Sequence, residues 1–415
     1  MNIIEEANRL MEIDNVDEAM ELLNKQLPKA SDEELYWYAE FYLNWGFLNE
    51  AENLLLQLLE TYPDESEVKL YLTDIYIEQE MDEKAIDLLN SIPEEDESYL
   101  QALVALADLY QAQGLFEVAE QKLLQAKEIN PSEPVIDIAL GELYYFFGDF
   151  KRAITFYEKT LNNPVQNIPI YERLAESYAN VGEYELALTY YEKTDNKNPD
   201  MLFKYGVTAY QADRKDIAIH AWEELLDEDP YYHTAYMQLA KAYEDEELLK
   251  EAYETTLNGL KQDEFNKELY FLAGSLAHKC NLDEESEKHI REAVNLDTDY
   301  KEAVLFLIEL LKEKNKSDEI IELINMVKEY GGDDPLYDWE LARAYVEIES
   351  YNDALNHYKE AYNSLQHDSD FLREYGYFLV EEGRTREAVN VLTNYLKDEP
   401  QDDEVLEYVN RLKEL

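Results

Sequence analysis

Cysteine and positive charge are scarce in this chain of 415 residues. The single cysteine, Cys280, excludes an intramolecular disulfide framework and any zinc site built from cysteine ligands. Only 36 Lys and Arg stand against 94 Asp and Glu, which gives a formal net charge of −58. A surface with this acid excess repels the phosphates of nucleic acids and of anionic lipids, so we expect no nucleic acid among the partners.

Long apolar runs are lacking as well. No window approaches the roughly 18 uninterrupted apolar residues that a membrane-spanning helix needs, so we expect no stable membrane insertion. The first residues, from Met1 to Glu6, contain no basic segment of the kind that opens a secretory signal peptide. Together with the near absence of cysteine, this favours a cytoplasmic location.

Glycine, with 12 residues, and proline, with 11, are too few to supply the turns of a many-stranded fold. The apolar share of 46% is that of a folded chain rather than of an acidic disordered one. Apolar side chains recur at helical spacing, for example at Leu103, Leu106, Ala107 and Tyr110. The sequence therefore predicts an all-α fold.

The chain also contains an internal repeat, marked by a recurring alanine. The interval is 34 residues, except for 32 between Ala19 and Ala51 and 31 between Ala187 and Ala218. This alanine column consists of Ala19, Ala51, Ala85, Ala119, Ala153, Ala187, Ala218, Ala252, Ser286, Ile320, Ala354 and Ala388. It predicts twelve helix-turn-helix repeats over residues 1–402, starting near residues 1, 32, 66, 100, 134, 168, 199, 233, 267, 301, 335 and 369.

Further columns keep the same register. A second column of small residues lies twelve positions before the alanine column, and ten of its twelve members are Ala or Gly. This small column consists of Ala7, Ala39, Thr73, Ala107, Gly141, Ala175, Gly206, Ala240, Gly274, Ile308, Ala342 and Gly376. Small residues on both helices of a hairpin let the two backbones approach closely. Between the two columns, Gly46, Gly114, Gly148, Gly182 and Gly383 mark the turn.

The sixth repeat shows the pattern most completely. It reads Tyr171-x2-Leu174-Ala175-x2-Tyr178, then Ala187-x3-Tyr191, then Pro199. In these positions the chain resembles the tetratricopeptide repeat (TPR) family, whose motif is W-x2-L-G-x2-Y, A-x3-F and P at a period of 34. The resemblance implies a right-handed α-α superhelical solenoid. It also implies that the first helix of each repeat lines a concave groove that binds peptides or partner helices.

Two parts of the chain depart from the regular pattern. After the last repeat, residues 403–415 carry the apolar stripe Val405, Leu406, Val409 and Leu412, which predicts a helix that caps the end of the solenoid. In the tenth repeat, both small positions hold isoleucine, and Gly331-Gly332 replaces the closing proline. We expect irregular packing or a hinge within residues 286–334; a degenerate but rigid repeat is the alternative.

Residues that could carry chemistry are few. No two of the six histidines stand at positions i and i+4, and no phosphate-binding loop, nucleophile elbow or calcium-loop spacing occurs. His278 and Cys280 are two positions apart and would point to different faces of a helix. We therefore expect no catalytic residue, no metal site and no cofactor, and the protein is not expected to be an enzyme.

One column of the expected groove is acidic. One position after the small column, the second to sixth repeats carry Glu40, Asp74, Asp108, Glu142 and Glu176, which we call the acidic column. Aligned carboxylates on one wall suit a segment that carries Lys or Arg. The alternative is a solvated acidic face, because acids are common throughout this chain.

An apolar column lies three positions before the small column in the later repeats. It consists of Phe203, Met237, Phe271, Leu305 and Trp339, and Tyr36 holds the same position in the second repeat. Exposed, it would form an apolar groove for an amphipathic helix; the alternative is packing against the next repeat. Tyr145, Phe146 and Tyr210 add aromatic surface nearby, and Lys241 and Arg343 bring positive charge to the groove of the second half.

These patterns together predict a non-enzymatic adaptor or scaffold that binds partner proteins or peptides in its concave groove. The first half should favour basic segments, and amphipathic helices are the other expected ligand. Two alternatives remain: an intracellular signal-peptide sensor that regulates a partner, and a chaperone-like holder of a client helix. An acidic groove argues against capture of a partner's C-terminal carboxylate, which needs cations.

Overall fold

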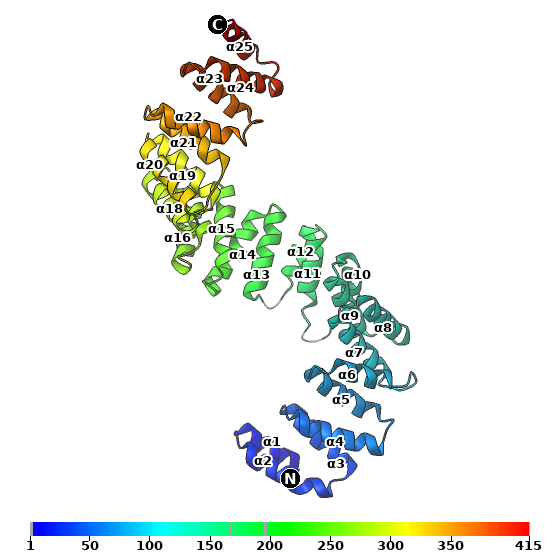
Figure 1. Ribbon diagram of the computed structural model, residues 1–415. Helices are drawn as coiled ribbons and strands as arrows, with labels where there is room; N and C mark the ends of the chain where they lie inside the picture. Colours follow the sequence, from blue (N-terminus) through cyan, green and yellow to red (C-terminus); the bar gives the residue numbers. More distant parts are fainter. Residues whose placement is uncertain (1–2, 164, 166–167, 195–196, 415) are drawn as a thin grey trace. The chain divides into compact units, whose positions relative to one another are not determined.

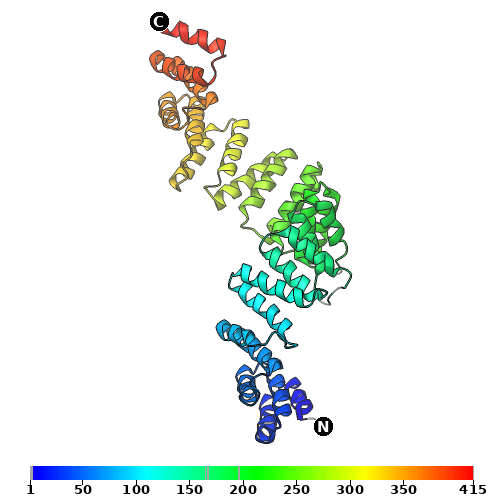
Figure 2. The same ribbon diagram turned by 90° about the vertical axis from the view of Figure 1, so that its right-hand side faces the viewer.

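The computed structural model describes residues 3–163, 165, 168–194 and 197–414. In that part of the chain it contains 25 α-helices and one short 3₁₀ helix and no β-strand, which confirms the expected all-α fold (Figure 1). The chain divides into two compact units, residues 1–197 and residues 198–415. Within each unit, consecutive helices lie side by side as pairs (Figure 2).

The first unit contains six helix pairs. Its helices are α1 (Ile3–Glu12), α2 (Val16–Gln26), α3 (Asp32–Asn44), α4 (Leu48–Thr61), α5 (Ser66–Glu78), α6 (Asp82–Asn90), α7 (Tyr99–Ala112), α8 (Phe116–Ile129), α9 (Pro134–Phe146), α10 (Phe150–Thr160), α11 (Ile170–Asn180) and α12 (Tyr184–Tyr191). The 3₁₀ helix η1 (Leu27–Lys29) follows α2.

The second unit contains six further pairs and a final single helix. Its helices are α13 (Pro199–Gln211), α14 (Lys215–Glu228), α15 (His233–Asp245), α16 (Leu249–Gln262), α17 (Lys267–Lys279), α18 (Asp283–Leu296), α19 (Lys301–Glu313), α20 (Ser317–Glu329), α21 (Pro335–Glu347), α22 (Tyr351–Tyr362), α23 (Ser369–Glu381), α24 (Thr385–Asp398) and α25 (Asp403–Lys413). Odd-numbered helices up to α23 are the first helices of a pair, and even-numbered ones the second.

The turn inside each pair has one residue in the left-handed region. In five turns it is a glycine that the sequence marked, such as Gly46 with φ 78°. After it, the Phe47 N–H donates to the carbonyl of Tyr42 at 2.8 Å, which closes the end of α3 as in a Schellman motif. In the other seven turns the residue is not glycine: Asp14, Glu80, Asp213, Glu247, Asn281, Asn315 and Glu349.

The two small columns lie where paired helices cross most closely. Every member of the alanine column is at most 2% exposed. A methyl group on Gly206 would lie 2.3 Å from the Trp222 Nε1, and one on Gly376 would lie 2.3 Å from Leu392 Cδ2. The large side chain four residues after the alanine column therefore occupies the space that a side chain in the small column would need.

The last helix, α25, packs on α24 as part of one apolar cluster. Val405 and Val409 are buried and Leu412 is 7% exposed, but Leu406 is 41% exposed. The predicted apolar stripe is thus narrower than expected, because Leu406 faces away from α24. In the described part of the chain, no helix has the length and apolar character to cross a bilayer.

The tenth pair, α19 and α20, buries both of its isoleucines. Ile308 is fully buried and Ile320 is 2% exposed, and both belong to one apolar cluster. In the preceding pair, Ser286 Oγ donates to the carbonyl of Gly274 at 2.8 Å. The hydroxyl that stands in place of the usual alanine methyl is therefore buried with a hydrogen-bond partner. The loop after α20 contains Gly331 at φ 102°.

A hinge at this loop remains a prediction. If it exists, backbone amides within residues 328–336 will exchange with solvent faster than those of the other loops between pairs, because local opening needs few buried contacts there. Hydrogen exchange followed by mass spectrometry measures this directly. Exchange at residues 328–336 no faster than in the loop at residues 263–266 would contradict the hinge and favour a rigid repeat.

Candidate partner-binding surface

Three members of the acidic column form an open surface on the first unit. Glu40, Asp74 and Asp108 lie on α3, α5 and α7, and all three are exposed. Among the described residues none of the three side chains has an ion-pair or hydrogen-bond partner in the structure. Desolvation by surrounding protein raises the pKa of Asp74 and of Asp108, and Glu78 adds to the rise at Asp74. An opposite charge brought to Asp74 or Asp108 would offset this desolvation.

The other two members of the acidic column are held by the chain itself. Arg173 Nε donates to Glu142 Oε1 at 2.8 Å, and Arg173 Nη1 lies 3.3 Å from Glu176 Oε2. The Tyr157 hydroxyl donates to Glu142 at 2.9 Å, and the Tyr145 hydroxyl donates to Glu176 at 2.7 Å. Glu176 is only 4% exposed. These two members of the acidic column already have a cation, because the guanidinium of Arg173 on α11 neutralises both.

The aromatic residues predicted for the first unit have different surroundings. Tyr36 packs edge-on against Tyr71 of the next first helix, with 5.4 Å between ring centroids. Phe146 is 67% exposed and lies 5.6 Å from Phe116. Its neighbour Phe147, which sequence reasoning did not single out, is 62% exposed and also contacts Phe116. Two adjacent phenylalanines at a helix end were the available signal.

The apolar column of the second unit packs mainly between successive pairs. Ring centroids lie 5.1 Å apart for Phe203 and Tyr232, and 5.3 Å apart for Phe271 and Tyr300. Trp339 is 8% exposed and packs on Phe371 of α23 at 5.4 Å. Three further predicted positions are half-buried: Met237, Leu305 and Tyr210. Of the two alternatives for this column, the exposed groove is wrong at Trp339, because Phe371 of the next first helix, α23, packs on the indole.

Most groove cations of the second unit already have carboxylate partners. Lys279 pairs with Glu244. The nearby aromatic residue Tyr210 is not a cation, but its hydroxyl donates to another carboxylate, that of Asp245. Lys312 Nζ lies 2.5 Å from Glu340 Oε2 and 2.9 Å from Glu309 Oε1. Lys241 is exposed on α15. The positive charge that the sequence placed in this half is thus largely neutralised within the chain.

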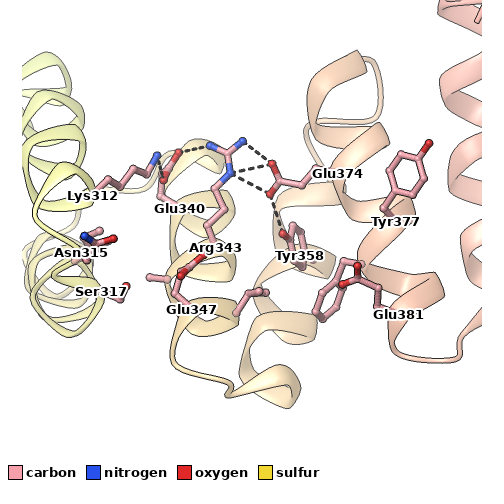
Figure 3. A pocket seen from close by; sticks show the side chains of 14 residues that line it. Lys312, Asn315, Ser317, Glu340, Arg343, Glu347, Tyr358, Glu374, Tyr377 and Glu381 are labelled. Carbon is pink, nitrogen blue, oxygen red and sulfur yellow. Dashed lines mark hydrogen bonds and ion pairs between the residues drawn. The ribbon is translucent and has the colours of Figure 1, made fainter.

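Arg343 forms the densest of these clusters (Figure 3). Its Nη2 donates to Glu374 Oε2 at 2.6 Å, its Nε lies 3.0 Å from both Glu374 oxygens, and its Nη1 donates to Glu340 at 2.7 Å. The Tyr358 hydroxyl and the Trp339 indole N–H also donate to Glu374. Burial would raise the pKa of Glu374, but these donors and the Arg343 charge outweigh it and lower that pKa.

A pocket of about 640 Å³ opens beside this cluster. First helices α19, α21 and α23 supply most of its wall, and Ile320 and Tyr358 come from the second helices α20 and α22. Its lining also includes Glu347, Tyr377 and Glu381, which sequence reasoning missed. Among the residues that the structure describes, no group of His, Cys, Asp and Glu is arranged to hold a metal ion.

Helix pairs with close small columns and a repeating turn are the architecture of the tetratricopeptide repeat class, and the comparisons agree. Models of YpiA-like tetratricopeptide repeats match residues 111–165, and models of YpiA-like C-terminal tetratricopeptide repeats match residues 335–402. General tetratricopeptide repeat models match residues 46–107 and 168–194. The TPR repeat-containing protein YpiA of Bacillus subtilis (strain 168) is 39% identical over 99% of this chain and 98% of its own length. The chain therefore belongs to the tetratricopeptide repeat family, among the YpiA-like proteins.

Solved structures give weaker similarities. The crystal structure of YrrB, described as a TPR protein with an unusual peptide-binding site, is 18% identical and covers 44% of this chain and 95% of that one, with a TM-score of 0.39. The Cut9–Hcn1 hetero-tetramer of the APC/C is 11% identical and covers 99% of this chain and 95% of that one, with a TM-score of 0.36. Tetratricopeptide repeat proteins generally mediate protein–protein interaction, and that is the class to which this chain belongs.

Proposed function

We propose that this protein is a non-enzymatic adaptor or scaffold, and that its first unit binds basic segments of partner proteins. The observation that carries the proposal is the row formed by Glu40, Asp74 and Asp108. These three carboxylates are exposed, uncompensated by the described part of the chain, and placed on three successive first helices. Acids on a solvated face would be scattered over both helices of a pair, whereas these recur at one position of the repeat.

The spacing of the row sets what it can bind. Neighbouring packed helices lie about 8–10 Å apart, and an extended chain advances about 3.3 Å per residue. A partner with Lys or Arg at roughly every third residue would therefore place one cation against each carboxylate. Each exposed pair contributes about 0.2–1 kcal/mol, so affinity arises from several weak contacts on a preformed surface. The net charge of −58 also attracts basic partners from a distance.

Neutralising the row tests this proposal. The variant Glu40→Gln, Asp74→Asn, Asp108→Asn should bind a labelled peptide of repeating Lys-Ala-Ser about tenfold more weakly than wild type, since three pairs of this strength total about 0.6–3 kcal/mol. Binding by wild type should weaken as salt rises, because exposed charges are screened. Fluorescence anisotropy with the purified full chain measures both effects.

A matched variant controls for the overall loss of charge. Glu60→Gln, Asp87→Asn, Glu117→Gln removes three exposed carboxylates from the second helices α4, α6 and α8. This variant should bind the peptide as wild type does. Equal weakening in both variants would contradict the proposal, because it would show attraction to net charge alone. Affinity capture from a lysate of the source cells, compared between the same variants, would then identify the partners that depend on the row.

A further inference from the structure

The pocket beside the Arg343 cluster combines aromatic walls with two carboxylates that the chain leaves uncompensated. Apolar surface comes from Ile320, Val346 and Phe378, and Tyr377 supplies a half-buried ring. Glu347 and Glu381 are both exposed and line the same pocket. Among the described residues neither has a hydrogen-bond or ion-pair partner in the structure, which sets them apart from Glu340 and Glu374.

Both cations of the pocket are paired with carboxylates of this chain. Lys312 is bound to Glu340, and all three donating nitrogens of Arg343 contact Glu340 or Glu374 (Figure 3). These two cations therefore balance those two carboxylates. The remaining formal charge in the lining is the pair Glu347 and Glu381, so the pocket attracts a cation and repels an anion.

The positions of the two free carboxylates strengthen this field. Glu347 is the last residue of α21 and Glu381 the last residue of α23. Helix C-termini carry a partial negative charge and favour cations, but neither helix has a basic residue in its last turn. Two negative helix ends and two carboxylates thus meet at one pocket, and neither helix has a cation in its last turn to offset them.

We propose that this pocket binds an arginine side chain of a partner protein. A guanidinium can stack on the face of Tyr377 or Phe378 while its planar donors engage Glu347 or Glu381, which a compact ammonium does less well. The volume of about 640 Å³ falls within the roughly 300–1,000 Å³ of ligand pockets and leaves room for the backbone that carries the arginine. The inference rests on the proposed function in one respect, that partner chains lie along the first helices.

Methyl NMR of the full chain tests the pocket with a defined probe. Nα-acetyl-arginine amide should shift the methyl signals of Ile320 and Val346 saturably, and the citrulline analogue, which has the same shape without the charge, should bind about tenfold more weakly or not at all. The variant Glu347→Gln, Glu381→Gln should lose the arginine response to a similar degree. The control Glu313→Gln, Glu382→Gln removes two exposed acids outside the lining, one at the end of α19 and one directly after α23, and should respond as wild type does.

Each other outcome overturns the inference. Equal binding of arginine and citrulline, or an undiminished response in Glu347→Gln, Glu381→Gln, would show that the two carboxylates do not select a cation. Tighter binding of Nα-acetyl-glutamate amide would show instead that Arg343 or Lys312 is free to receive an anion. These results are separable from the proposed function, since the Lys-Ala-Ser peptide reports on the first unit and the arginine probe on the second. Either test can fail while the other succeeds.

Discussion

Replacing Trp222 by alanine is expected to lower the free energy of unfolding of the surrounding pairs by about 3–5 kcal/mol, the range for large aromatic truncations in a core. The indole is fully buried, lies against Gly206, and donates from Nε1 to the carbonyl of Phe203 at 3.3 Å. Gly206 has no side chain and cannot fill the cavity that loss of the indole leaves. The loss should be confined to α13 and its neighbours, since repeats contact mainly their nearest neighbours.

Hydrogen exchange resolves this local effect better than a single melting temperature, because a repeat array need not unfold in one step. Amides of α13 and α14 should lose protection in Trp222→Ala, while those of α3 and α4 keep theirs. Trp45→Ala is the matched control, because Trp45 is 36% exposed and makes one hydrogen bond, to Asn8. Unchanged protection of α13 in Trp222→Ala would contradict the close packing that we describe for the small column.

The second large effect is expected from Arg343→Met, which keeps the aliphatic stem but removes the guanidinium. Glu374, which is half-buried, and Glu340, which is buried, would then each have fewer hydrogen-bond donors. Removing one partner of a buried ion pair costs about 3–5 kcal/mol, and we expect about 2–3 kcal/mol because Arg343 and Glu374 keep some solvent access. Arg384→Met, at an exposed pair with Glu387, should cost about 0.5 kcal/mol or less.

The pH dependence of Arg343→Met gives an independent check. In the wild type the pKa of Glu374 is lowered, so its pairing stabilises the fold above the pKa of the unfolded chain and is lost as the pH falls through the folded pKa. In the variant, burial remains and raises this pKa, so protonation relieves a buried charge. The stability difference between variant and wild type should therefore shrink on acidification. A difference that is constant between pH 7 and pH 4 would show that packing, and not charge, is what Arg343 contributes.

The repeat could be predicted because its small residues recur at a nearly constant interval in the sequence. The side-chain contacts between neighbouring helix pairs could not be predicted in this way. Glu142 and Asp108 occupy the same position of the repeat, yet only Glu142 is neutralised, since Arg173 stands 31 residues further on. The second unit repeats this spacing between Arg343 and Glu374. A search for opposite charges 31 residues apart would have identified Glu142 and Glu374 as paired. Analysis of each column alone could not identify them, because it compares equivalent positions and ignores contacts between different positions of successive repeats.

The turns show a similar division. Five of them carry the glycine that a left-handed backbone favours, and the sequence identified those. At Glu80 and Glu349 the same conformation is imposed on a residue that pays about 1–2 kcal/mol for it, so no local signal exists. The pocket at Glu347 and Glu381 was missed for a related reason: acids are so frequent here that only the absence of a partner in the structure distinguishes these two.

The arrangement of contacts within each unit has a consequence for how the chain folds. Helices that pack closely are neighbours in the sequence or are separated by a single helix, so the loops that must close are short. Low contact order allows rapid folding, and a chain built of such pairs can nucleate at more than one place. A few successive pairs can therefore pack together before the rest of the chain has been synthesised. Few contacts in this chain join residues that are far apart in sequence. This order of events therefore limits the time during which apolar helix faces are exposed to solvent and can aggregate.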